Sequence, residues 1–309
     1  MELTSTQRRT LEQLIGVGPP PGYDPELAGQ IRHSIERRLD ASGVLAGEGE
    51  PIWLGKQRLN DRDRCEGLFE AALLREGPPF QHSAPTAAGG LFHKAIELDI
   101  ATSRAFDPRS VSERAARRLG DTDDAFGAFW RELDPFAKAE LVVESGRRLT
   151  MFRDSFPPLP RRWAPQPELL ARVRLAGGRV VLSALPDLVL GCSRRLLIDF
   201  KSGRLWPDHA EDMRFYALVF LLRTGVPPYR VATFFLDSGE WQPEEVSEQM
   251  LSRAADRVVH SATTAHALRS GRPADLRPGP HCAWCPRRTG CPALEAADPR
   301  SAAGVATGR

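Results

Sequence analysis

The stretch from Leu169 to Lys201 constrains the fold more than any other part of the chain. Upstream of Pro165 the apolar residues recur with helical spacing, whereas "LLARVRLAGGRVVLSALPDLVL" alternates and breaks only at Gly177-Gly178. This pattern predicts two strands joined by a tight turn. "RRLLIDF" predicts a third strand, after the turn at Gly191-Cys192-Ser193. A sheet therefore follows a long helical region.

A hairpin between strands 180–190 and 195–201 would bring Asp187 and Asp199 close together on one sheet face. Two adjacent carboxylates repel each other, and the pKa of one rises unless a cation neutralises the pair. Mg²⁺ or Mn²⁺ suits such a site because these ions accept carboxylate, carbonyl and water ligands. Lys201 lies on the same strand face as Asp199 and can orient an attacking water. The pattern favours metal-dependent phosphodiester hydrolysis, and the alternative is a hairpin with ordinary charged ends.

The remaining elements are predicted from periodicity. Two helices joined by the linker "GVGPPPGYDP" are expected in the first fifty residues. Further helices are predicted over 60–75 and 89–102, mainly over 105–152, then over 210–225 and 244–270, with a strand over 229–237. We expect an N-terminal helical extension (1–54), one main domain (55–295) and a disordered tail (296–309).

The charge balance limits how the chain can meet nucleic acid. The formal net charge is +2 in 309 residues, so any such contact must come from a local basic surface. Arginine pairs are scattered along the chain, and each of the following alone favours a solvated face: Arg37-Arg38, Arg117-Arg118, Arg147-Arg148, Arg161-Arg162, Arg194-Arg195 and Arg287-Arg288. A secretory or membrane segment is not expected, and the predicted compartment is the cytoplasm.

The carboxylate pattern, Pro186-Asp187 followed by Asp199-Phe200-Lys201, resembles the PD-(D/E)XK nuclease superfamily, and within it the RecB-like group. That resemblance implies an α/β, restriction-endonuclease-like core with a central mixed sheet flanked by helices. It implies that Asp187, Asp199 and the backbone carbonyl of Phe200 bind the metal and that Lys201 positions the nucleophile.

Three further features agree with the group. The segment "GGLFHKAIEL" resembles the helix that supplies a metal-binding histidine, here His93. Glu168 precedes the first strand, where an acidic residue often stands, although a solvated strand-end charge is an equal alternative. In this group the helix after the lysine strand carries a tyrosine that, together with the residue four positions before it, flanks the phosphate of the substrate. Tyr216 matches this tyrosine.

That preceding residue departs from the group, because Asp212 stands where a glutamine is usual. A carboxylate cannot donate a hydrogen bond to phosphate unless it is protonated. Asp212 can instead bind metal, pair with a cation such as Arg214, or weaken the activity.

The cysteines form a second pattern. Cys282, Cys285 and Cys291 lie within "HCAWCPRRTGCP", and Cys65 lies far upstream. This layout resembles the Fe–S-containing RecB-like exonucleases, which include CRISPR-associated adaptation nucleases, AddB-type nuclease domains and exonuclease V. It implies a [4Fe–4S] cluster that joins the N-terminal helical region to a C-terminal loop. Zn²⁺ stays the alternative because four thiolates bind either group, and Cys192 is expected to be a free thiol.

The function expected from these features is a Mg²⁺- or Mn²⁺-dependent deoxyribonuclease, an exonuclease on single-stranded DNA, in DNA repair, recombination or defence. "EPIWLGKQ" lacks the Walker glycine and hydroxyl residues, so any unwinding would need a helicase or other DNA-processing partner. One alternative is a catalytically weak nucleic-acid-binding or scaffolding subunit that has drifted at Asp212. Another is a zinc-stabilised interaction protein.

Overall fold

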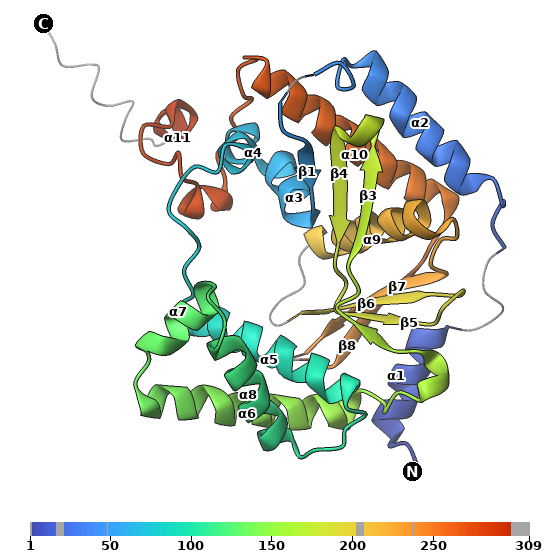
Figure 1. Cartoon of the computed structure of the whole chain (residues 1–309), viewed down its shortest axis with the longest axis vertical. Helices are drawn as coiled ribbons and strands as arrows, with labels where there is room; N and C mark the ends of the chain where they lie inside the picture. The colour runs from blue at the N-terminus through green and yellow to red at the C-terminus, as the bar shows by residue number, and fades with distance from the viewer. Residues whose placement is uncertain (1, 17–21, 48, 202–206, 237, 298–309) are drawn as a thin grey trace, which may run out of the picture. The chain divides into compact units, whose positions relative to one another are not determined.

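The computed structural model describes residues 2–16, 22–47, 49–201, 207–236 and 238–297, and the chain divides into two compact units (Figure 1). The first unit comprises Met1–Leu27, Phe80–Ala171 and Leu185–Leu251. The second comprises Ala28–Pro79, Arg172–Ala184 and Ser252–Arg309. Each unit has its own sheet.

The first unit contains a five-stranded mixed sheet in the order β2-β5-β6-β7-β8. The strands are β2 (Gln166–Pro167), β5 (Leu188–Leu190), β6 (Leu196–Lys201), β7 (Arg230–Phe235) and β8 (Glu240–Glu245). Strands β5 and β6 pair antiparallel, as do β7 and β8, whereas β6 and β7 pair parallel. The parallel pair is connected through α9 (Pro207–Thr224), because a parallel connection needs a long crossover. This is the mixed α/β arrangement expected from the sequence.

Alternate residues of the central strands divide the sheet into two faces. Phe200 and Phe234 join one buried cluster with Phe152 and Phe156, and the Phe152 and Phe200 ring centroids lie 5.4 Å apart. Helix α5 (Ala84–Ala101) supplies further residues to this cluster. Asp199 has the opposite orientation along β6, and α9 contacts β6 and β7 outside this cluster. The sheet therefore has helices on both faces.

The predicted helical stretch 105–152 is three helices: α6 (Pro108–Gly120), α7 (Ala125–Glu132) and α8 (Pro135–Ser155). Each of these helices has an aspartate at its N-cap, whose carboxylate accepts a hydrogen bond from a backbone N–H of the first turn that would otherwise be unpaired. Asp107 accepts from Ser110 N at 3.0 Å, and Asp124 and Asp134 cap α7 and α8 in the same way. In Figure 1 these helices form a layer with α5 beside the five-stranded sheet. Helix α1 (Ser5–Ile15) packs against α8 and β8.

The second unit is built on a three-stranded sheet in the order β1-β4-β3. Its strands are β1 (Ile52–Leu54), β4 (Val180–Ala184) and β3 (Ala171–Leu175), and its helices are α2 (Leu27–Ala41), α3 (Lys56–Arg64), α4 (Glu66–Leu73), most of α10 (Glu248–Arg269) and α11 (Pro292–Ala297). The β3–β4 turn uses positive φ angles of 63° at Gly177 and 93° at Gly178, a conformation that favours glycine. The predicted Gly-Gly hairpin is thus confirmed.

Three element predictions need correction. The strand expected over 180–190 is two strands in different sheets, because Pro186 has no N–H and interrupts the ladder. The helix expected over 60–75 breaks at Cys65, whose backbone is extended. Strand β8 was missed because Pro243 and its glutamates do not resemble a strand, yet they are tolerated at an exposed sheet edge.

The C-terminal tail and the helices bear on two further expectations. Apart from Ala296 and Ala297 in α11, the predicted tail lies outside the described residues. Within the described residues, every helix is too short or too polar to cross a bilayer.

Candidate active site

The β5–β6 hairpin positions both aspartates of the predicted pair. The register joins Leu188 to Ile198, so the same register carried one residue further sets Asp187 opposite Asp199. The Oδ2 atom of Asp187 accepts a hydrogen bond of 2.6 Å from the backbone N–H of Phe200. This bond anchors the Asp187 carboxylate to the backbone of the neighbouring strand.

Asp199 is buried beside a cation. Its side chain is only 1% exposed, and the ammonium of Lys201 contacts its Oδ2 atom. The two residues share one face of β6, because side chains two positions apart along a strand point the same way. A buried carboxylate is tolerated where a cation offsets its charge. The predicted Asp-x-Lys pair is therefore assembled.

Helix α5 brings His93 to the same place. Its Nδ1 atom lies 3.5 Å from Oδ1 of Asp187. Burial lowers the pKa of His93, but its hydrogen bond to Asp187 and the charges of Asp187 and Asp199 outweigh burial and raise the pKa overall. The site therefore combines two carboxylates, an imidazole and an ammonium from one hairpin and one helix.

Helix α9 places Asp212 and Tyr216 near this group, and both are buried. Burial raises the pKa of Tyr216, and the negative charges of Asp199, Asp187 and Asp212 raise it further. Arg214, one of the candidate partners of Asp212, donates hydrogen bonds to Glu211 at 2.6 Å and to Glu244 at 3.0 Å.

The sequence model of the PD-(D/E)XK nuclease superfamily matches residues 57–292, which include every one of these side chains. This chain belongs to that superfamily. Its members are typically metal-dependent nucleases that use divalent ions such as Mg²⁺ or Mn²⁺.

Two solved structures are similar to this PD-(D/E)XK chain at low identity. The crystal structure of SSO0001 aligns at 12% identity and a TM-score of 0.32, covering 84% of this chain and 94% of the other. A "Putative exonuclease" from Eubacterium rectale aligns at 11% identity and a TM-score of 0.41, covering 74% and 84%. No curated protein matches significantly. The superfamily assignment rests on the family match.

Sequence reasoning missed two charged residues on α5. Lys94 contacts Glu97, and its Nζ lies 3.9 Å from Oε2 of Glu168. Burial raises the pKa of Glu168, and the charge of Glu97 raises it further. Glu168 also donates its backbone N–H to the carbonyl of Asp187 at 3.0 Å, so its backbone lies beside the site while its side chain is 42% exposed. The available signal was the four-residue spacing of His93 and Glu97, which places both on one helix face.

The donor set of this PD-(D/E)XK site fits a hard divalent ion, because it offers carboxylate oxygens and an imidazole nitrogen. As the side chains stand, however, no three His, Cys, Asp or Glu residues within the described ranges are arranged around one ion position. Asp187 is engaged by Phe200 N–H and His93, and Asp199 by Lys201.

The second unit gathers the four predicted cysteine ligands. Cys65, Cys282, Cys285 and Cys291 all line one cavity of about 510 Å³. Burial raises the pKa of the Cys285 thiol, and charge on the other three cysteines raises it further, so the four sulfurs are close enough to interact. Backbone N–H groups of the loop point to two of them, at 3.5 Å from Cys65 Sγ and 3.4 Å from Cys282 Sγ. Cys192 lies exposed elsewhere, as expected.

Proposed function

We propose that this protein is a Mg²⁺- or Mn²⁺-dependent deoxyribonuclease of the RecB-like group that degrades single-stranded DNA from an end. The observation that carries the proposal is the convergence of Asp187, Asp199, Lys201 and His93 within one unit. These residue types together can carry out metal-assisted phosphodiester hydrolysis, and a hairpin with merely solvated ends would not bury Asp199 beside an ammonium.

The side chains divide the work. Asp187, Asp199, His93 and the carbonyl of Phe200 would hold the divalent ion. A bound ion would polarise a phosphoryl oxygen and offset the charge that develops in the transition state. Lys201 orients the attacking water, since a compact ammonium can donate in several directions.

The cysteine cavity supports the assignment to the Fe–S subgroup. Four thiols from distant parts of the sequence line one cavity. Four thiolates can bind either Zn²⁺ or an Fe–S cluster, so the choice between them rests on the cysteine layout, which resembles that of the Fe–S-containing RecB-like exonucleases. On that layout we propose that Cys65, Cys282, Cys285 and Cys291 bind [4Fe–4S].

A cleavage assay tests the nuclease. The protein, purified without oxygen, is incubated with end-labelled single-stranded and duplex DNA, with Mn²⁺ or with EDTA. We expect ion-dependent shortening of the single strand from its ends. Lys201→Ala should lower the rate by about 100-fold or more, the usual range for losing a group that assists proton transfer. Lys138→Ala is the matched control, because this lysine sits on α8 over the Trp130 ring.

Three results would contradict the proposal. Equal cleavage by wild type and Lys201→Ala would mean that the activity belongs to a contaminant or to another site. Intact DNA with the wild type and Mn²⁺, while the protein still binds the strand, would favour the scaffolding role. Cleavage of circular single strands would show that the nuclease does not need an end.

A further inference from the structure

A second polar feature of the first unit lies where α5 ends and α6 begins. A hollow of about 410 Å³ opens there, with Leu98, Phe106 and Val111 as its apolar lining. Arg114, Arg117 and Arg118 border the same hollow. An apolar floor with a cationic rim matches a ligand that has one flat apolar part and one anionic part.

The three arginines share one side of α6, because positions 114, 117 and 118 are spaced by three and four residues. All three are exposed. Within the part of the chain that the structure describes, no ion pair joins them to an acidic side chain, although Asp121 also borders the hollow. Arg109 on the same helix, by contrast, bonds to Glu113 at 3.1 Å. The rim arginines are thus available to an external anion.

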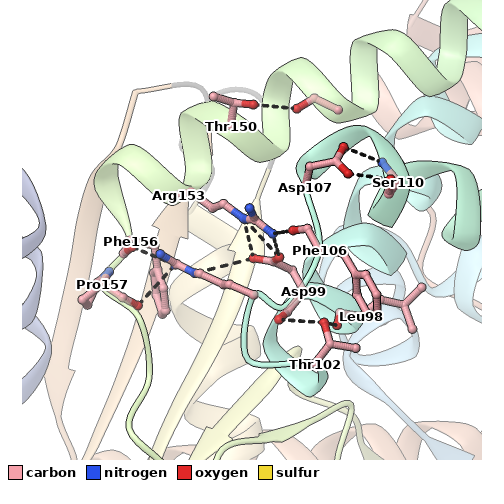
Figure 2. A network of polar contacts seen from close by, with 12 residues as sticks. Leu98, Asp99, Thr102, Phe106, Asp107, Ser110, Thr150, Arg153, Phe156 and Pro157 are labelled. Atoms are coloured by element: carbon pink, nitrogen blue, oxygen red, sulfur yellow. Dashed lines mark hydrogen bonds and ion pairs between the residues drawn. The ribbon is translucent and has the colours of Figure 1, made fainter. Parts of the chain in front are cut away.

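The floor is held in place by buried polar contacts (Figure 2). The carbonyl of Phe106 accepts a hydrogen bond of 2.6 Å from Arg153, which also binds the fully buried Asp99. The guanidinium carbon of Arg114 lies 3.6 Å from the centre of the Phe106 ring. Phe106 and Arg114 together form a flat stacking surface, and the backbone of Phe106 is held by Arg153.

We propose that this hollow binds one unpaired nucleotide of single-stranded DNA at a site separate from the hairpin carboxylates. The base stacks on the Arg114–Phe106 surface, and Arg117 and Arg118 bind the flanking phosphates. A duplex fits poorly, because its base faces are already stacked. The substrate class rests on the proposed nuclease function, whereas the hollow itself does not. The hollow is also a local basic surface, which contact with nucleic acid needs in a chain whose net charge is only +2.

Binding can be measured without cleavage. The probe is a fluorescein-labelled 20-nucleotide oligo(dT), titrated with the full chain in EDTA and followed by anisotropy over a range of salt concentrations. The double variant Arg117→Ala/Arg118→Ala should bind about tenfold more weakly at low salt. The slope of log K against log salt should become shallower by about 1.4, since each lost phosphate contact on a single strand removes about 0.7. Arg109→Ala, on the same helix, should change Kd less than twofold.

Phe106→Leu separates stacking from charge. It should weaken oligo(dT) binding about fivefold or more while leaving the salt slope unchanged, and circular dichroism confirms that the variant is folded. A duplex of the same length supplies the comparison. The proposal is overturned if the double arginine variant keeps the wild-type Kd and slope, or if both substitutions weaken duplex binding as much as single-strand binding.

These outcomes are independent of the nuclease test. Loss of binding in the arginine variant of a protein that never cleaves DNA would support the hollow and refute the nuclease. Normal binding by that variant of an active nuclease would refute the hollow alone.

Discussion

Replacing Asp99 with alanine should destabilise the helical layer of the first unit more than any single surface change. Asp99 is 0% exposed and lies between two guanidinium groups. Arg153 Nε donates to Oδ1 at 3.1 Å, and Arg104 Nε lies 3.6 Å from Oδ2. Each arginine also donates a hydrogen bond to a backbone carbonyl. Arg153 donates to Phe106 (Figure 2), and Arg104 donates to Phe156.

The magnitude follows from what the substitution leaves behind. The Arg104 and Arg153 side chains are only 15% and 18% exposed. Without the carboxylate, two cations remain close together and poorly hydrated, and breaking a buried pair in this way costs about 3–5 kcal/mol of unfolding free energy. Asp99→Asn keeps the shape and one acceptor but loses the charge, so it should cost less, about 1–3 kcal/mol.

Hydrogen exchange measured by mass spectrometry is the suitable assay, because a chain with two compact units need not unfold in one transition. Peptides from α5 and α8 should lose protection by the stated amount, with urea unfolding as a second measure. Glu113→Ala is the reference: it removes an exposed pair with Arg109 and should change stability by less than about 1 kcal/mol. A destabilisation by Asp99→Ala no larger than that by Glu113→Ala would mean that the buried carboxylate does not hold this layer together.

Three other predictions address the sites and the pH dependence. Asp212→Gln should raise the cleavage rate, because the amide can donate to a phosphate; a lower rate would show that the carboxylate itself is required, and an unchanged rate would show that no donor is needed there. Cys285→Ala should lower the iron and sulfide content expected for the proposed [4Fe–4S] cluster and lower thermal stability, whereas Cys192→Ala should do neither; iron content identical to wild type would exclude Cys285 as a ligand of the proposed cluster. Tyrosine ionisation, followed by ultraviolet absorbance, should show no phase at pH 10 in the folded protein. Burial raises the pKa of Tyr23 to about 12 and also raises those of the other tyrosines, Tyr216 and Tyr229. Because the unfolded chain loses these protons first, stability should fall as the pH rises from 10 towards 12, and Tyr23→Phe should reduce that fall. A full-amplitude phase at pH 10 before unfolding would contradict this.

The part of the site that sequence could predict is encoded locally. Asp187, Asp199 and Lys201 belong to one hairpin, where strand alternation and a short turn determine which side chains meet. His93 could be predicted as a site residue only from the family resemblance, because no local rule connects a residue on α5 with a hairpin about a hundred residues later. Glu97 was missed although it lies one helical turn from His93.

The division into two sheets was not predictable from periodicity. Strands β4 and β5 form one alternating run in the sequence, and β4 is assigned to a different sheet only by its pairing with β1, which lies far upstream in the chain. The hollow between α5 and α6 was not predictable from periodicity either. The sequence alone indicates that Arg117-Arg118 is a solvated pair, and only the hydrogen bond from Arg153 to the Phe106 carbonyl holds an aromatic ring beside these arginines.

The break at Pro186 also explains why Asp187 is held so firmly. The hairpin register sets Phe200 opposite Pro186, where the β5 ladder has already ended at Leu188. The N–H of Phe200 is therefore satisfied by the side chain of Asp187, at 2.6 Å, in place of a strand carbonyl. The end of the ladder at Pro186 thus orients the Asp187 carboxylate, since the buried N–H of Phe200 needs an acceptor. The proline that precedes the aspartate and the residue between Asp199 and Lys201 act together to position one ligand of the proposed metal site.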